Sequence, residues 1–342
     1  MRPRAPKGWA AIRFGGRQIA PGQAAELRLE VSEFYTAEPL AVPVTVLRGR
    51  RPGPTLFLTG AVHGDELNGV AIIRDLLIDQ DFSDLAGTLI AVPVVNVPGF
   101  LHQSRMLPDN RDLNRSFPGS AEGSFTARLA QRMFHEVIRR SDFGIDLHTA
   151  GGDRANYPHV RADLSDRRVA ELAAAFGSPV VIHGRGPGGA LRRAAADAGV
   201  PTIVYEAGSA RVFERRFIDQ GIAGVQNVLR HLGMLDGGPV GQPPLRLEVR
   251  KSSWLRASAG GILDLKVALG EAVARGQVIS INTNPFGRER SQLVSPAAGI
   301  VIGLTRSPLV HPGDAICHLA RLRSRDVARW RDHRKGESRA TV

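Results

Sequence analysis

A histidine and a glutamate three residues apart have the types and spacing of a metal-binding pair. They are His63 and Glu66 in the segment GAVHGDELNG. The pair follows the apolar run TLFLTGAV and precedes a segment with helical spacing, where an α/β fold exposes functional groups at the end of a strand. Zinc accepts nitrogen and oxygen ligands of this kind. The pair alone is a weak signal, because a polar turn with Asp65 as the cap of the next helix would look the same.

A second histidine, His148, directly follows the strand-like run FGIDL and precedes the loop TAGG. Asp146 lies two residues earlier on the same face of the predicted strand, where its carboxylate can orient an imidazole. Taken singly, His148 would be an ordinary histidine at the end of a strand. With His63 and Glu66 it completes a set of two histidines and one glutamate, the pattern of catalytic zinc sites that keep one coordination position open.

The segment SRMLPDNRDLNRSFPG concentrates cationic and amide side chains between a predicted strand and a predicted helix. Guanidinium groups bind carboxylates through paired hydrogen bonds and stabilise the oxyanion that develops on a carbonyl. Its charge alone would equally suit a solvated loop. The residues concerned are Arg105, Arg111, Asn114 and Arg115. A further carboxylate, Glu206, ends the apolar run VPTIVYE and is either a helix cap or a general base directed into a cleft.

The segments that must position these residues alternate between strand-like and helical patterns. Such alternation predicts an α/β domain with a parallel or mixed sheet. Helical spacing occurs at 67–79 and 125–140, and a long polar loop extends to about residue 122. The strand-like segments are 26–48, 55–62, 88–95 and 143–148, with further alternation up to the sequence RFIDQGIAGVQNVLRHLG.

A change of composition at GGPVGQPP, residues 237–244, indicates a linker. Before it we predict a catalytic domain, 1–240, whose residues 1–48 form a β-rich extension. After it, short β-type segments separated by Gly, Pro and Asn predict a small all-β domain over 245–322. The Arg-rich tail, 323–342, is predicted to be loosely ordered.

The charge and composition exclude several classes of protein. Residues 1–17 and 321–342 hold most of the net charge of +12, and no aromatic residues are interleaved with the basic ones, so no specific nucleic-acid partner is expected. No run reaches the roughly 18 apolar residues of a membrane helix, and the N-terminus lacks the apolar stretch of a signal peptide. With a single cysteine, Cys317, these features predict a cytoplasmic protein.

Four motifs in this order resemble the succinylglutamate desuccinylase/aspartoacylase family of the zinc-carboxypeptidase superfamily. They are GAVHGDELNG, RDLNRSFPG, DLHTA and the strand that ends in Glu206. The resemblance implies a zinc-carboxypeptidase-like mixed sheet flanked by helices, with a smaller C-terminal β domain of the barrel-sandwich type. It implies one Zn²⁺ per chain, with His63, Glu66 and His148 as ligands. The implied reaction removes an acyl group from a small N-acyl amino acid or a related amide that carries a carboxylate.

The same resemblance implies roles for the other groups. Asn114 and Arg115 would hold the carboxylate of the substrate. Arg105 would polarise the scissile carbonyl, although Arg111 is a nearby competitor for that role. Glu206 would take a proton from the attacking water and return it to the leaving amine. No motif identifies the residues that read the acyl chain or the amino-acid side chain, and the candidates by neighbourhood are Arg154, Arg161 and Arg185.

Two other functions stay open at this stage. A zinc carboxypeptidase acting on short peptides would use the same residues, although the C-terminal domain is expected to restrict the cleft to small substrates. The segment GRGPGG, residues 184–189, matches the G-x-G-x-x-G pattern of dinucleotide-binding proteins. Against this, Pro187 removes a backbone donor that a pyrophosphate would need. The C-terminal domain is predicted to be a structural cap or a contact in a homo-oligomer.

Overall fold

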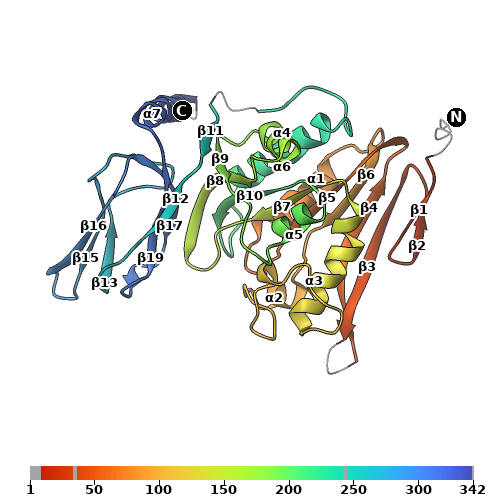
Figure 1. Cartoon of the computed structure of the whole chain (residues 1–342), viewed down its shortest axis with the longest axis horizontal. Helices are drawn as coiled ribbons and strands as arrows, with labels where there is room; N and C mark the ends of the chain where they lie inside the picture. The colour runs from red at the N-terminus through yellow and green to blue at the C-terminus, as the bar shows by residue number, and fades with distance from the viewer. Residues whose placement is uncertain (1–8, 34–36, 242–244, 341–342) are drawn as a thin grey trace.

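The structure, a computed structural model, describes residues 9–33, 37–241 and 245–340 (Figure 1). Within these residues the main element is a mixed sheet of 13 strands. The main path of the sheet, in spatial order, is β12 (Ser252–Arg256), β19 (Ala315–Arg321), β17 (Gly299–Thr305), β8 (Arg154–Ala162), β10 (Thr202–Ser209), β7 (Phe143–His148), β5 (Arg51–Gly60), β6 (Ala86–Val92), β4 (Pro39–Arg48) and β3 (Gln23–Glu33). The strands that pair beside this path are β9 (Val180–His183), β11 (Leu247–Val249) and β14 (Ala272–Val273).

Helices cover both faces of this sheet, because its central strands are apolar on both sides. In β6 all seven residues are buried, as expected for a strand enclosed between two layers. On one face α1 (Asn68–Asp79), α4 (Arg167–Phe176) and α6 (Arg215–His231) enclose one hydrophobic core. On the other face α3 (Phe125–Glu136) packs against β3 and α5 (Leu191–Asp197) packs against β10, and they enclose a second core. The expected mixed α/β sheet flanked by helices is confirmed.

The predicted elements of the α/β part agree with the structure where the hydrophobic pattern is long. The helix expected over 67–79 is α1, and the one expected over 125–140 is α3 followed by the short 3-10 helix η2 (Ile138–Arg140). The predicted long loop contains two short helices, α2 (Val97–Leu101) and η1 (Leu113–Arg115). Segments of three to five residues are too short to show a helical period, so the sequence did not reveal them.

The C-terminal strands form a small β unit beside the α/β part, seen in blue in Figure 1. A four-stranded antiparallel sheet packs with β12, β17 and β19 around a separate hydrophobic core. Its strands, in order, are β16 (Glu289–Val294), β15 (Val278–Thr283), β13 (Gly261–Leu265) and β18 (Leu309–Val310). Strand β17 pairs antiparallel with β8, so the large sheet continues from the α/β part into the C-terminal strands.

The two ends of the described chain are small elements on this body. At the N-terminal end, β1 (Ile12–Phe14) and β2 (Arg17–Ile19) form a two-stranded sheet. The prediction of a loosely ordered tail was wrong, because the chain forms helix α7 (Ser324–Ala340). Trp330 in α7 is fully buried and donates a hydrogen bond from Nε1 to the carbonyl oxygen of Gly270, at 2.9 Å. In the part of the chain that is described, no helix is long and apolar enough to cross a membrane.

Candidate active site

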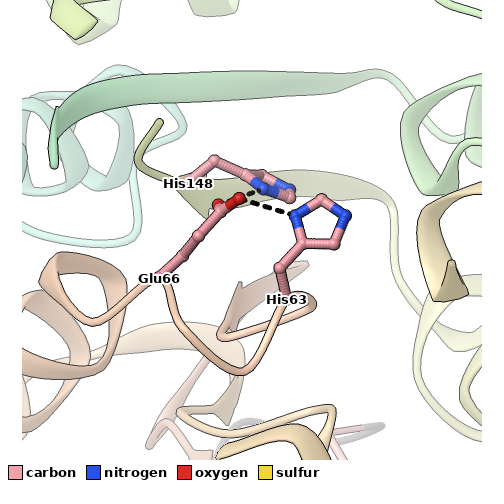
Figure 2. Close-up of side chains that lie close together, drawn as sticks. All are labelled: His63, Glu66 and His148. Carbon is pink, nitrogen blue, oxygen red and sulfur yellow. Dashed lines mark hydrogen bonds and ion pairs between the residues drawn. The ribbon is translucent and has the colours of Figure 1, made fainter. Parts of the chain in front are cut away.

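His63, Glu66 and His148 meet at the carboxyl ends of two neighbouring parallel strands. Strands β5 and β7 pair with Gly60 opposite Leu147, so the residues that follow them emerge at the same edge of the sheet. His63 Nδ1 lies 2.7 Å from Glu66 Oε1, and His148 Nδ1 lies 2.8 Å from Glu66 Oε2. Figure 2 shows both imidazoles directed at this one carboxylate. The three side chains are buried, and their ligand atoms lie within 4.8 Å of one another.

The turn that carries His63 and Glu66 is held by close backbone packing. A Cβ atom on Gly64 would lie 1.9 Å from the carbonyl carbon of Gly99 in α2, so only glycine fits there. Asp65 does not cap the next helix, since its Oδ2 accepts a hydrogen bond from the backbone N–H of Gly152. The alternative of a simple capping turn is therefore wrong, and the turn presents two side chains to the interior.

Each histidine directs its second ring nitrogen at another carboxylate. His148 Nε2 lies 2.7 Å from Asp146 Oδ2, so Asp146 has the contact with the imidazole that was expected. His63 Nε2 lies 3.1 Å from Asp112 Oδ1. Sequence reasoning missed Asp112, although it directly precedes the Leu-Asn-Arg of the RDLNR motif. Carboxylates in this position fix the ring orientation of metal-binding histidines and increase their basicity.

The charges of the group compensate one another. Burial by itself lowers the pKa of His148, but Asp146 and Glu66 outweigh it, so the pKa lies well above its usual value. Burial likewise lowers the pKa of His63, and Glu66 and Asp112 raise it on balance. Burial raises the pKa of Glu66, but the two imidazoles hold it far below its ordinary value. The negative charge of Glu66 is thus balanced by the two imidazoles that contact it.

The structure brings Arg105 to this group and leaves Arg111 in solvent. Arg105 NH1 lies 3.2 Å from His63 Nδ1 and 3.4 Å from Glu66 Oε1, and its NH2 donates to Asp112 Oδ2 at 2.8 Å. The Arg111 side chain is 65% exposed, and its nearest carboxylate oxygen, on Asp109, is 3.9 Å away. Arg105 lines the cavity described below, whereas Arg111 does not, so the structure favours Arg105 over Arg111 as the arginine of the site.

Asn114 and Arg115 lie in η1, at the rim of the same cavity. Asp112 orders this turn by accepting a hydrogen bond from the backbone N–H of Asn114, at 2.8 Å. The side-chain oxygen of Asn114 accepts from the backbone N–H of Leu191, at the start of α5. A Cβ atom on Gly189 would lie 2.1 Å from the carbonyl oxygen of Arg115. The last glycine of the G-x-G-x-x-G match thus serves close packing of two loops.

Glu206 faces the cavity from strand β10. The parallel pairing of β10 with β7 sets it opposite His148, one strand away from the histidine–glutamate group. Glu206 Oε2 accepts a hydrogen bond from Asn156 at 2.8 Å, and Oε1 accepts from Arg161 Nε at 3.2 Å. The helix-cap alternative is wrong, because Glu206 lies inside a strand and not at a helix start.

A cavity of about 410 Å³ joins these residues. Its walls also include Ser252 and Trp254 of β12, which sequence reasoning did not connect with the site because they lie beyond the predicted linker. Of the three arginines named by neighbourhood, two line the cavity and Arg185 does not. Arg192 of α5 lines it as well and was missed. Burial, with a contribution from nearby Arg161, lowers the pKa of Arg192 to about 10.

The chain belongs to the succinylglutamate desuccinylase/aspartoacylase family, whose catalytic-domain model matches residues 52–232, more than half of the chain. It is 31% identical over 266 residues to the N-alpha-acetyl-L-2,4-diaminobutyric acid deacetylase of Halomonas elongata, which covers 74% of this chain and 78% of that protein. The predicted class of enzyme, a hydrolase of linear amide bonds, is the class of such relatives.

Solved structures agree with this family membership. The crystal structure of a succinylglutamate desuccinylase/aspartoacylase from Rhodobacter sphaeroides superposes with a TM-score of 0.79 at 27% identity, covering 88% of this chain and 95% of that one. The product-bound ectoine utilization protein EutE from Ruegeria pomeroyi superposes with a TM-score of 0.80 at 26% identity, covering 87% and 95%. The arrangement of sheet, helices and C-terminal strands is therefore that of this family.

Proposed function

We propose that this chain is a zinc-dependent amidohydrolase that removes the acyl group from a small N-acyl amino acid. The observation that carries the proposal is the buried group of His63, Glu66 and His148, which shares one cavity with Glu206. The relative from Halomonas elongata, named for its action on an N-acetylated amino acid, supports the substrate class. The carboxypeptidase alternative is less well supported, because a cavity of about 410 Å³ suits a small molecule better than a peptide chain.

The residues of the group fit zinc by the chemistry of their donor atoms. Two imidazole nitrogens and one carboxylate leave a coordination position open, and Asp112 and Asp146 support the two imidazoles from behind. His63, Glu66 and His148 would hold the ion. When bound, zinc polarises a carbonyl and makes water a stronger nucleophile near neutral pH.

The remaining groups carry out the proton transfers and stabilise charge. Glu206 accepts the proton of the attacking water and donates it to the nitrogen of the leaving amine, as general base and then general acid. The Arg105 guanidinium, directed at the buried group, donates hydrogen bonds to the carbonyl oxygen of the amide as negative charge develops there. Preorganised donors of this kind need no reorganisation during the reaction.

Asn114 and Arg115 bind the carboxylate of the amino acid at the cavity rim. The side-chain oxygen of Asn114 is already engaged by Leu191, so its NH₂ group faces the substrate. Arg115 is exposed, its NH1 donates to the carbonyl oxygen of Asn114 at 2.6 Å, and its guanidinium would turn to bind the carboxylate with two parallel hydrogen bonds. We assign these steps to a cytoplasmic enzyme with a catalytic unit over 1–240. The β unit over 245–322 acts as a structural cap or as a contact in a homo-oligomer.

The test is hydrolysis of a panel of N-acetyl and N-succinyl amino acids and short peptides by zinc-loaded protein, with a chelated control. We expect chelator-sensitive release of one free amino acid from an acylated substrate. The Glu206→Gln variant should bind zinc normally and lose activity by about 10²–10⁴-fold. Faster hydrolysis of peptides than of any acylated amino acid would favour the carboxypeptidase instead. Full activity in the presence of a chelator would exclude the proposal.

A further inference from the structure

We propose that Asn156 and Arg161 are positioning residues that hold the carboxylate of Glu206 in the orientation needed for proton transfer. The inference rests on the proposed function, in which Glu206 is the general base. Asn156 Nδ2 donates to Glu206 Oε2 at 2.8 Å, and Arg161 Nε donates to Oε1 at 3.2 Å. Each oxygen therefore has one fixed donor and keeps capacity to accept a hydrogen bond from water in the cavity.

An irregularity in the sheet directs Asn156 at Glu206. Strands β10 and β8 pair antiparallel with Glu206 opposite His159, and the register shifts before Gly208. In a regular ladder Gly208 would face Tyr157, but the shift sets it opposite Asn156. The Tyr157 ring instead packs in a different core, and the Asn156 amide lines the cavity. β-Bulges beside active sites commonly redirect a side chain in this way.

Asn156 and Arg161 contact the Glu206 carboxylate from two points along β8, one on each side of the residue that lies opposite Glu206. Arg161 lies opposite Val204 and Asn156 opposite Gly208, so the pair brackets Glu206 along β8. Asn156 is 6% exposed and Glu206 has a side chain that is 16% exposed, which leaves little room for other rotamers. A carboxylate held by two donors on a sheet is fixed more narrowly than one on a loop, and misplacement of a reacting group by 1 Å can lower a rate by about 100-fold.

The C-terminal β unit packs against Asn156 and so helps to keep its side chain directed at Glu206. Gly303 of β17 lies opposite Asn156 in the β17–β8 pairing. A Cβ atom on Gly303 would lie 3.2 Å from Asn156 Oδ1 and 3.1 Å from the Cβ of His318, so the amide is packed directly against the backbone of β17. The C-terminal strands thereby contribute to the orientation of the general base, in addition to supplying part of the cavity wall.

The test compares steady-state kinetics of zinc-loaded variants on the acylated amino acid that the unmodified chain hydrolyses fastest. Asn156→Ala should lower kcat by about 10- to 100-fold with KM changed less than about 3-fold, because orientation and not binding is lost. Asn156→Asp keeps the volume of the side chain but removes the donor, so its kcat should fall at least as far. Bound zinc should stay at the level of the unmodified chain in both variants.

The role of Arg161 is tested by comparing a substitution that removes its charge with one that keeps it. Arg161→Gln should lower kcat by about 10-fold or more, and Arg161→Lys should recover a clear part of the loss, since it restores a charged donor. Arg167 of α4, an exposed arginine paired with Glu171, provides the matched control, and Arg167→Gln should leave kcat unchanged. A structural role alone would not give a selective loss of kcat that a lysine restores.

The outcomes separate this proposal from the function on which it rests. If Glu206→Gln is inactive while both Asn156 variants and Arg161→Gln keep their kcat, the positioning role is overturned and the general base stands. If Glu206→Gln retains full activity, the proposed function itself fails. A loss of kcat that appears only together with a loss of bound zinc would also overturn the proposal, because the defect would then lie in the metal site.

Discussion

Asp112 and His63 lie 3.1 Å apart, between Oδ1 and Nε2, on the side of the imidazole that faces away from Glu66. The second oxygen of the same carboxylate accepts from Arg105 NH2 at 2.8 Å. One carboxylate therefore fixes both a proposed zinc ligand and the arginine proposed to stabilise the oxyanion. His63 and Arg105 are 42 residues apart in the sequence, contact each other directly at 3.2 Å and are both held by this side chain.

Because Asp112 contacts both residues, its substitution should impair both zinc binding and kcat. Asp112→Asn should weaken zinc binding by about 10- to 100-fold, because the imidazole loses the carboxylate that orients it and increases its basicity. At saturating zinc, kcat should still be reduced, because Arg105 loses its anchor. Competition with a chromophoric chelator measures the affinity. Asp81→Asn, at an exposed turn, serves as the control, and equal zinc affinity in the two variants would contradict the expectation.

Removal of the metal should lower the stability of the folded chain. A ligand that binds only the native state at 1,000 times its Kd contributes about 4 kcal/mol to the free energy of unfolding. We expect zinc to raise the melting temperature of the chelator-treated protein. In the His148→Ala variant the same addition should have almost no effect. A similar rise of the melting temperature in both proteins would mean that zinc binds elsewhere.

Two buried histidines outside the proposed metal site predict loss of stability in acid. Burial, followed by the charge of Arg161, lowers the pKa of His318 to about 3, and the same causes hold the pKa of His159 well below its usual value. Between about pH 6.5 and pH 3 the unfolded chain binds protons that the native chain does not. The contribution of these two histidines to the free energy of unfolding is therefore complete above pH 6.5 and decreases as the pH falls, by up to about 1.4 kcal/mol per pH unit for each histidine.

Urea unfolding of the chelator-treated protein at several pH values between 5 and 6.5 measures this effect. The stabilisation that His63 and His148 provide through their raised pKa values is present at low pH and is lost only as the pH rises above this range. His318→Gln should show a shallower dependence on pH than the unmodified chain over this range. An unchanged slope would contradict the assignment to His318.

The glycines at 188 and 189 offer a matched pair of substitutions. Gly189 has a φ of +77°, and a Cβ atom there would lie 2.1 Å from the carbonyl oxygen of Arg115. Gly189→Ala should displace the turn that carries Asn114 and Arg115, and KM should rise several-fold or more while bound zinc is unchanged. A Cβ atom on Gly188 meets no atom within 4 Å, so Gly188→Ala should be nearly silent. Equal kinetics for the two variants would disprove the role of this packing.

The burial of Trp330 indicates that helix α7 contributes to the stability of the folded chain. The indole is fully buried beside Tyr157 and donates to the carbonyl oxygen of Gly270. Trp330→Ala should lower the free energy of unfolding by about 3–5 kcal/mol and make α7 an early site of limited proteolysis. Arg331→Ala, at an exposed position of the same helix, should change neither. Protease resistance of α7 in the tryptophan variant would contradict this.

The sequence contained enough to predict the type of fold and to single out the residues that form the buried histidine–glutamate group. Long apolar runs and helical spacing predicted β5, α1, α3 and β7, because a buried strand or helix has its apolar residues at regular intervals in the sequence. His63, Glu66 and His148 were recognisable because local spacing fixes where side chains at strand ends must point. Short helices and the buried face of α7 left no such pattern, since a single tryptophan in an Arg-rich segment gives no period.

Only the tertiary structure decided which partners complete the site. Asp112 faces His63, and Asn156 faces Glu206, through pairings between segments 49 and 50 residues apart. The register shift between β10 and β8 that turns Asn156 into the cavity depends on the two strands meeting, and no pattern in either strand alone specifies it. The same holds for Trp254, which lines the cavity, and for Gly303, which packs against Asn156, because β17 continues the large sheet. The local sequence determines which functional side chains stand at the end of a strand, whereas non-local packing determines which residues those side chains contact.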